Sequence, residues 1–151
     1  MDEVRLAEII ATGAHYGQTD KGGNPYIEHP HAVSSMVYSK DEKVVAWLHD
    51  VVEDTDVTIK DLEKLFPHSI CKSVDAITKR NSESRSDYIT RVSGDKVATA
   101  VKIADLTHNS DLSRLNRKLS REDYNRVKKY AKEIEFLKEN AYAKYKFSCR
   151  N

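Results

Sequence analysis

The stretch WLHDVVEDT, residues 47–55, places one histidine and three carboxylates within six positions. At about 100° per residue in an α-helix, Glu53, Asp50 and Asp54 lie roughly 40°, 100° and 140° from His49, and apolar side chains fill the remaining arc. We therefore expect residues 41–53 to form one helix that has an apolar face and a compact face of acids and imidazole.

That polar face has two interpretations. The acidic side chains of an amphipathic helix usually do no more than face water. Three like charges within two turns repel one another, however, unless a cation neutralises them. Side chains of these types can also bind a metal or act as general acids and bases. The choice depends on whether other parts of the chain supply further ligands.

Helical spacing of apolar residues recurs along the rest of the chain, and no alternating pattern persists. The polar, glycine-rich stretch QTDKGGNP, residues 18–25, indicates a loop. We see no repeat and no linker. The pattern predicts an all-α, single-domain bundle of roughly eight helices over residues 1–151. The helices are expected near residues 4–17, 30–37, 41–53, 58–66, 68–78, 86–92, 95–109 and 120–145.

Composition limits the possible partners and compartment. The 151 residues suffice for one domain with a core, and 25 Lys and Arg against 24 Asp and Glu predict no nucleic-acid polymer as partner. The acidic start MDEVRLAEII differs from a signal peptide, and the longest apolar run, VVAWL, is too short to cross a membrane. Cys71 and Cys149 form no CxxC motif. We expect a cytoplasmic protein without a membrane segment.

The segment ADLTHNSDL, residues 104–112, is a second acidic centre. On a helix, Asp105, His108 and Asn109 share one face, because they are three and four residues apart. Apolar residues flank Asp105, and a carboxylate in such surroundings needs a partner. A metal ion would provide one, and a buried lysine or arginine is the alternative.

Three motifs follow one another along the chain: PYIEHP, LHDVVEDT and VKIADLTHN. In this order they resemble the HD-domain phosphohydrolases and, within them, the hydrolase domain of the RelA/SpoT alarmone enzymes. The resemblance runs from residue 14 to about residue 115, with a similar closing helix beyond. The chain is too short for the synthetase and regulatory domains of the long members. It resembles the small, hydrolase-only type, as in the metazoan SpoT homologues.

The resemblance implies a metal held by His29, His49, Asp50 and Asp105. Two imidazoles and two carboxylates form a mixed nitrogen and oxygen site, which suits Mn²⁺ better than Ca²⁺ or Mg²⁺. Mn²⁺ is the metal usual in the family, and iron, cobalt or zinc are possible substitutes on ligand grounds. Since a histidine must be neutral to bind a metal, we expect occupancy to fall in acid.

The resemblance also implies that Glu53 and Asp54 are required for hydrolysis. One carboxylate can orient and deprotonate the attacking water, and the other can carry the proton onward; which residue does which stays open. The residues implied or suggested to bind substrate are Lys21, Asn109, Tyr130, Arg85 and Arg91. For Arg85 and Arg91 the alternative is that they are plain surface arginines. We interpret His15 and His108 as structural supports, Tyr26 as packing for the loop, and His68 as a surface residue.

Two positions depart from the family pattern. Family members usually have Arg-Lys in the substrate loop, and this chain has Asp20-Lys21. Asp111 stands where an arginine is common. Both changes replace a basic residue by an acidic one, and they leave the identity of the substrate open.

The first hypothesis is therefore metal-dependent removal of the 3′-pyrophosphate from a guanosine alarmone, ppGpp or pppGpp. The second is the same chemistry on another small phosphorylated nucleotide, such as an adenosine alarmone or NADPH. The third is a nucleotide- or metal-binding module without turnover, against which the presence of both Glu53 and Asp54 argues. A plain helical interaction domain leaves the metal ligands unexplained. The oligomeric state stays open.

Overall fold

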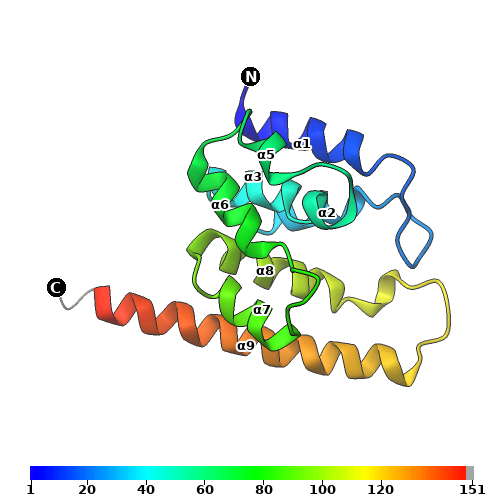
Figure 1. Ribbon diagram of the computed structural model, residues 1–151. Coiled ribbons are helices and arrows are strands. Elements are labelled where there is room, and N and C mark those ends of the chain that lie inside the picture. The colour runs from blue at the N-terminus through cyan, green and yellow to red at the C-terminus, as the bar shows by residue number, and fades with distance from the viewer. Residues whose placement is uncertain (149–151) are drawn as a thin grey trace.

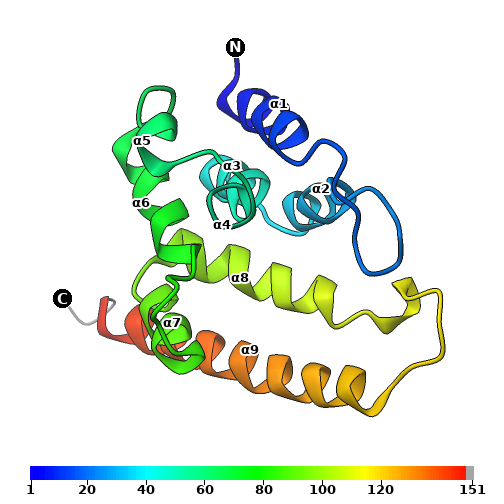
Figure 2. The same cartoon turned by 45° about the vertical axis from the view of Figure 1, so that its right-hand side comes forward.

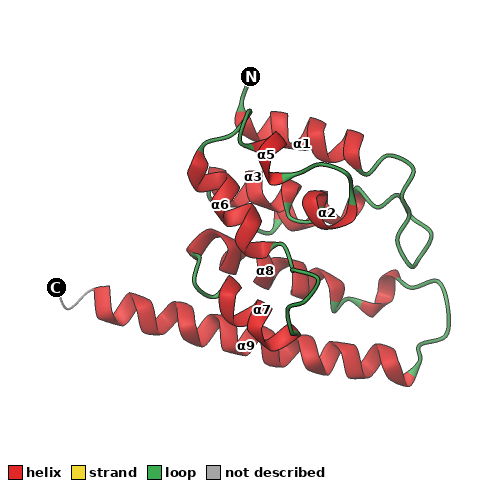
Figure 3. Ribbon diagram, in the orientation of Figure 1, coloured by secondary structure: helices red, strands yellow, loops and turns green. Residues whose placement is uncertain are grey.

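The computed structural model describes residues 1–148, with side chains for residues 1–141, 143 and 144. Within these residues it contains nine α-helices, one short 3-10 helix and no strand (Figure 3). The prediction of an all-α bundle is thus confirmed. The elements are α1 Glu3–Ala14, α2 Glu28–Ser35, α3 Lys40–Leu48, α4 Val51–Asp54, α5 Ile59–Leu62, α6 His68–Ile77, α7 Arg85–Val92, α8 Lys96–Asn109, η1 Leu112–Arg114 and α9 Arg121–Ser148.

Helices α3 and α8 form the centre of the bundle. α3 packs against α1, α2, α6 and α8, and α8 packs also against α2, α6, α7 and α9. The long helix α9 runs beside α8 in both views (Figures 1 and 2). The loop between α1 and α2 and the segment between α8 and α9 lie at the same end of the molecule (Figure 1). Residues from the beginning, middle and end of the chain can therefore meet at that end.

The helix expected over residues 41–53 is interrupted at His49 and Asp50. α3 ends at Leu48, and α4 begins at Val51. The Nδ1 atom of His49 lies 2.7 Å from the carbonyl oxygen of Ala46, which a continuous helix would offer to the amide of Asp50. Because the His49 imidazole binds this carbonyl in place of the Asp50 amide, the prediction of one continuous helix was wrong. Neighbouring side chains on an unbroken helix point in different directions, whereas the break turns His49 and Asp50 to the same side.

Other helix boundaries depart less from expectation. α1 ends at Ala14 and not near residue 17, and Gly17 has a left-handed backbone with a φ of 80°. α5 contains four residues, and turns replace the rest of the helix expected up to residue 66.

Cys71 is buried, whereas Cys149 lies outside the described residues. No described helix combines the length and apolar character needed to cross a membrane.

A capping box formed by Ser120 and Asp123 begins α9. The Ser120 hydroxyl accepts a hydrogen bond from the Asp123 amide, and the Asp123 carboxylate accepts one from the Ser120 amide. Arg117 and Arg126 both donate to the same carboxylate, which is almost completely buried. Farther along, the fully buried Leu137 anchors the helix in the core. α9 is thus attached at its first turn by charge and in its middle by packing.

We expect Leu137→Ala to lower the free energy of unfolding by about 2–5 kcal/mol, because it leaves a cavity between α9 and the core. Urea titration followed by circular dichroism measures this change. Lys138→Ala removes an exposed neighbour and should change stability little. Equal effects of the two substitutions would contradict the anchoring role of Leu137.

The contribution of Asp123 should depend on pH. Hydrogen bonds from Arg117 and from the Ser120 amide hold the pKa of the Asp123 carboxyl well below its usual range. A carboxyl with a lowered pKa stabilises the fold fully above its unfolded pKa of about 3.9, and loses this contribution as the pH falls. Asp123→Asn should therefore lower the melting temperature at pH 7, and the difference from the wild type should shrink below about pH 4. A difference that is constant from pH 7 to pH 3 would refute this role.

Candidate active site

Three helices bring His29, His49 and Asp105 together in the interior. His29 lies on α2, His49 follows α3, and Asp105 lies on α8. One donor atom of each lies within 4.8 Å of the other two. The Nε2 atoms of the two histidines are 3.2 Å apart, and Asp105 Oδ1 lies 2.9 Å from His29 Nε2 and 3.6 Å from His49 Nε2. Three of the four predicted metal ligands thus form one buried cluster.

Asp50, the fourth predicted ligand, reaches the histidines from the break between α3 and α4. Its Oδ2 atom lies 2.9 Å from His49 Nε2 and 3.8 Å from His29 Nε2. The same oxygen accepts a hydrogen bond from the Tyr26 hydroxyl. Tyr26, predicted only to pack the loop, therefore also orients a candidate ligand.

Asp105 has partners on both carboxylate oxygens. Lys102, one turn earlier on α8, places its Nζ atom 2.7 Å from Oδ2. Asn109 donates to Oδ1 at 2.8 Å. The sequence left open whether a metal or a buried basic residue compensates this carboxylate. The structure shows that a buried lysine does so through Oδ2, while Oδ1 faces the two histidines.

The outer nitrogens of the histidines set their tautomers. His49 Nδ1 faces the Ala46 carbonyl, which only accepts, so this nitrogen carries the proton. His108 Nδ1 lies 2.7 Å from His29 Nδ1 and 3.0 Å from the Arg114 guanidinium. Since arginine only donates, His108 Nδ1 is the acceptor and His29 Nδ1 the donor. The neutral form of each ring then directs a lone pair from Nε2 into the cluster.

This donor set fits a divalent transition metal. Two lone-pair nitrogens that face each other beside carboxylate oxygens need a cation between them. An ion with ligand distances of about 2.1 Å separates two nitrogens by roughly 3.0–3.4 Å at coordination angles between about 90° and 109°, and the two Nε2 atoms are 3.2 Å apart. Mixed imidazole and carboxylate ligands suit Mn²⁺, Fe²⁺, Co²⁺ and Zn²⁺.

Charge within the cluster keeps the acids ionised. Burial raises the pKa of Asp105, but Lys102 and the histidines outweigh it and hold the pKa well below 3.8. Burial likewise acts against ionisation of Asp50, and His49 lowers that pKa to about 2. Burial lowers the pKa of His49, but Asp50 and Asp105 reverse the effect and raise the pKa well above 6.5. A proton and a metal ion therefore compete for the same lone pair.

Glu53 and Asp54 lie on α4, one turn after Asp50, and both are exposed. The Glu53 carboxylate accepts a hydrogen bond of 2.8 Å from the Lys79 amide, which attaches α4 to the end of α6. Partial burial of the Asp54 carboxyl, and then the charges of Asp50 and Glu53, raise its pKa. A carboxyl with a raised pKa accepts a proton more readily than an ordinary carboxyl does.

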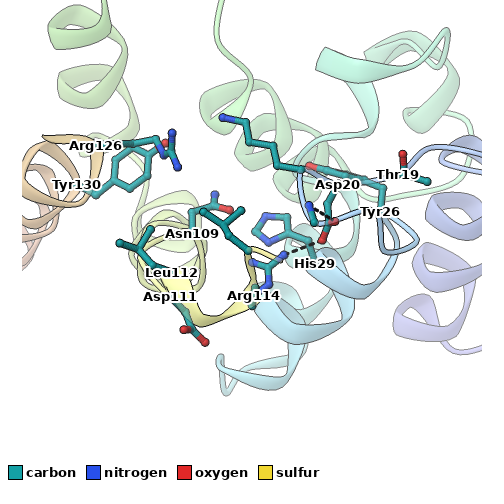
Figure 4. Close-up of a pocket in the computed structure, with 13 residues that line it drawn as sticks. Thr19, Asp20, Tyr26, His29, Asn109, Asp111, Leu112, Arg114, Arg126 and Tyr130 are labelled. Atoms are coloured by element: carbon teal, nitrogen blue, oxygen red, sulfur yellow. Dashed lines mark hydrogen bonds and ion pairs between the residues drawn. The ribbon is translucent and has the colours of Figure 1, made fainter. Parts of the chain in front are cut away.

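A cavity of about 350 Å³ opens beside the cluster, and His29 and Tyr26 form part of its wall (Figure 4). The substrate-binding residues predicted at Lys21, Asn109 and Tyr130 all line it. Three basic residues, Lys21, Arg114 and Arg126, and two acidic residues, Asp20 and Asp111, contribute to the lining. Figure 4 shows Arg126 and Tyr130 of α9 on one side of the cavity and Asp20 on the opposite side. Asn109 lies between them.

Both acidic residues that line the cavity have partners within the protein. Asp20 Oδ2 lies 3.1 Å from the Arg114 guanidinium. Asp111 caps η1, where its Oδ1 atom accepts hydrogen bonds from the amide and the hydroxyl of Ser113. The structure therefore supplies a basic partner for Asp20 that the sequence did not indicate.

Comparisons with known proteins identify the family of the chain. The family model described as HD domain matches residues 7–102. The chain belongs to the HD-domain family. The resemblance to the RelA/SpoT enzymes is supported by relatives. The bifunctional (p)ppGpp synthase/hydrolase SpoT of Escherichia coli K12 is 35% identical over a region that covers 70% of this chain and 17% of the relative.

Two further relatives extend the comparison. A probable guanosine-3′,5′-bis(diphosphate) 3′-pyrophosphohydrolase of Synechocystis is 34% identical over 85% of this chain and 18% of the relative. The HD domain thus spans less than a fifth of the length of these curated relatives. A solved structure of a metazoan orthologue of SpoT, described as hydrolysing ppGpp, has a TM-score of 0.76 and 26% identity. That match covers 91% of this chain and 85% of the other.

Arg85 and Arg91, also predicted to bind substrate, do not line this cavity of the HD domain. Arg85 donates two hydrogen bonds to Glu133 of α9 and lies 5.9 Å from the centre of the Tyr130 ring. Arg91 binds Glu83 through two nitrogens and also donates to three backbone carbonyls. These contacts attach α7 to its neighbours, and a role in substrate binding stays a prediction for both.

The sequence interpretation missed Lys102, Arg114 and Arg126. Lys102 had a readable signal, since it precedes Asp105 by three residues on one helix. Arg126 had a weaker one, because it lies one turn before Tyr130 on α9. Arg114 had none, since its partner Asp20 is 94 residues away along the chain.

Replacement of one ligand should separate metal binding from folding. We expect His29→Ala, His49→Ala and Asp105→Ala each to weaken Mn²⁺ binding by about 100-fold or more, because loss of even an outer partner costs 10–100-fold. Calorimetric titration and metal analysis of the purified proteins measure this loss. The matched control is His68→Ala, which removes an exposed histidine outside the cluster. Wild-type affinity in a folded His49→Ala protein would remove this residue from the ligand set.

Proposed function

We propose that this HD domain is a metal-dependent hydrolase that removes the 3′-pyrophosphate from a guanosine alarmone. The substrates would be ppGpp and pppGpp, and the products GDP or GTP and pyrophosphate. The observation that carries the proposal is that His29 belongs both to the buried donor cluster and to the wall of a cavity with basic residues. A substrate in the cavity would thus present a phosphate to the metal centre. The names and titles of the relatives support the guanosine alarmone.

We propose His29, His49, Asp50 and Asp105 as the ligands, and Mn²⁺ as the ion. A bound divalent ion neutralises charge on the attacked phosphate and lowers the pKa of the attacking water. Lys102 neutralises one of the two acidic ligands, so that the ligand set keeps one net negative charge and the loaded centre is positive. A positive centre attracts the phosphate groups of a nucleotide.

Glu53 and Asp54 would handle the proton. The raised pKa of Asp54 allows this carboxyl to receive a proton from the attacking water and to release it to solvent, because the residue is exposed. Glu53 is held in place by the Lys79 amide, and its charge contributes to the raised pKa of Asp54. The two carboxyls act as a coupled pair, so proton transfer belongs to both.

The remaining predicted residues would position the substrate. Asn109 lies between the cluster and the cavity, because its amide donates to Asp105 and its side chain also lines the wall. Lys21 adds positive charge from the loop, and Tyr130 adds an aromatic surface from α9. Since α9 contributes to the cavity, we propose that residues 1–151 act as one HD domain.

Glu53→Gln and Asp54→Asn should keep the metal and lose turnover. General acid and base groups typically contribute about 10²–10⁴-fold to rate, and we expect losses in this range for pyrophosphate release from ppGpp. The control is Glu63→Gln, which replaces an exposed glutamate outside the site. Wild-type turnover in Glu53→Gln would exclude this residue from catalysis. Loss of Mn²⁺ in the same variant would move it into the ligand set.

A substrate panel tests the nucleotide. The second candidate is the same chemistry on another phosphorylated nucleotide, and the acidic residues Asp20 and Asp111 in the cavity wall favour it. We expect kcat/KM for ppGpp and pppGpp to exceed that for pppApp and NADPH by about tenfold or more, a difference of about 1.4 kcal/mol in transition-state binding. The opposite order would support the second candidate. Absence of turnover on every member in the presence of Mn²⁺ would overturn the catalytic proposal.

A further inference from the structure

Arg114 is held at the cavity wall by two anchors from different parts of the fold. One terminal nitrogen lies 3.1 Å from Asp20 Oδ2 in the loop between α1 and α2. The other lies 3.0 Å from His108 Nδ1 and 3.4 Å from the His108 carbonyl oxygen, at the end of α8. The side chain keeps 27% of its surface exposed and lines the cavity. A guanidinium has five N–H groups, so these two anchors leave donors for a further acceptor.

Asp20 mainly holds the loop between α1 and α2 and the Arg114 side chain in place. Its Oδ1 atom accepts hydrogen bonds of 2.9 Å from the amides of Gly22 and Asn24, and its Oδ2 atom faces Arg114. The loop and the segment after α8 are in close contact here, since a Cβ atom on Gly22 would lie 2.6 Å from the Arg114 carbonyl. Asp20 therefore forms the loop, orients the guanidinium and offsets part of its charge.

Arg114 stands apart from the metal centre. His108 separates it from His29, because His108 Nδ1 contacts both side chains. Arg114 therefore lies outside the donor cluster, and it offers an anion a contact that is distinct from the candidate ligands. Arg126, another cation of the wall, is exposed to a similar degree and pairs with Asp123, as Arg114 pairs with Asp20. Arg114 is suited to bind a second anion within the cavity because it lines the wall and keeps N–H donors beyond those that its anchors use.

We infer that Arg114 is a specificity-determining residue, whose guanidinium, held by Asp20 and His108, binds the phosphate arm of the substrate that is not hydrolysed. The inference rests on the proposed function and narrows its substrate class to nucleotides with two separate phosphate groups. A charge-assisted pair with phosphate makes Arg114 the source of affinity. Asp20, which lies next to the same phosphate, weakens that affinity while it positions the arginine. The two residues therefore act in opposite directions on binding.

GDP is the probe, because it carries the 5′ phosphate arm and no 3′ phosphate. Calorimetric titration of GDP into the Mn²⁺-loaded full chain should give an affinity about tenfold or more weaker in Arg114→Gln. Asp20→Asn keeps an acceptor for the loop amides and removes the charge, so GDP should bind about two- to tenfold more tightly. Arg114→Lys should lie between wild type and Arg114→Gln. Lys118→Gln, which removes an exposed charge nearby, should leave the affinity unchanged.

The outcomes distinguish this inference from its alternatives. If Asp20→Asn and Arg114→Gln weakened GDP binding equally, the ion pair between the two residues would serve only to hold the loop in place. This result would overturn the inference. Loss of Mn²⁺ affinity in Arg114→Gln would show that the arginine acts through His108 on His29, and would also overturn it. So would unchanged GDP affinity in Arg114→Gln, or no GDP binding by the wild type. Because the titration needs no turnover, failure of the hydrolase proposal appears separately, as absent pyrophosphate release from ppGpp.

Discussion

The burial of the Asp105 carboxylate is the constraint on which the rest of the site depends. A carboxylate inside a helical core is costly unless charge and hydrogen bonds compensate it. Lys102 supplies the charge at 2.7 Å, and His29 and Asn109 approach the other oxygen. Meeting these requirements brings α2 and the end of α3 against the middle of α8. The same contacts that compensate a buried acid thus assemble a donor set for a metal.

Interruption of a helix is the second structural device. His49 uses Nδ1 to bind the carbonyl of Ala46, and Asp50 lies beside the imidazole with its Oδ2 atom 2.9 Å from Nε2. The side chain that breaks the helix is therefore the one that presents a lone pair to the cluster. The four residues of α4 then place Glu53 and Asp54 beyond the break, where they are exposed to solvent. The candidate ligands and the proposed proton carriers are adjacent in sequence and lie in different environments.

The wall of the cavity combines residues from the first part of the chain, near the donor cluster, with residues from the last helix. His29 and Tyr26 come from the segment around α2, whereas Arg126 and Tyr130 come from α9. The attachment of α9 through Asp123 and Leu137 therefore also shapes the cavity wall. Arg126 pairs with Asp123 and also lines the cavity, so one side chain contributes both to the attachment of α9 and to the cavity wall.

The sequence by itself determined the all-α class, most helix positions and the residues that gather at the cluster, because helical periodicity and three ordered motifs are local signals. It did not determine the break at His49, since a side chain competes there with a backbone amide for one carbonyl. Nor did it distinguish a metal from Lys102 as the partner of Asp105, and both roles proved compatible because a carboxylate has two oxygens. The pairing of Asp20 with Arg114 was decided only by the tertiary structure: the two residues are 94 positions apart, and an ion pair at that separation leaves no periodic trace in the chain.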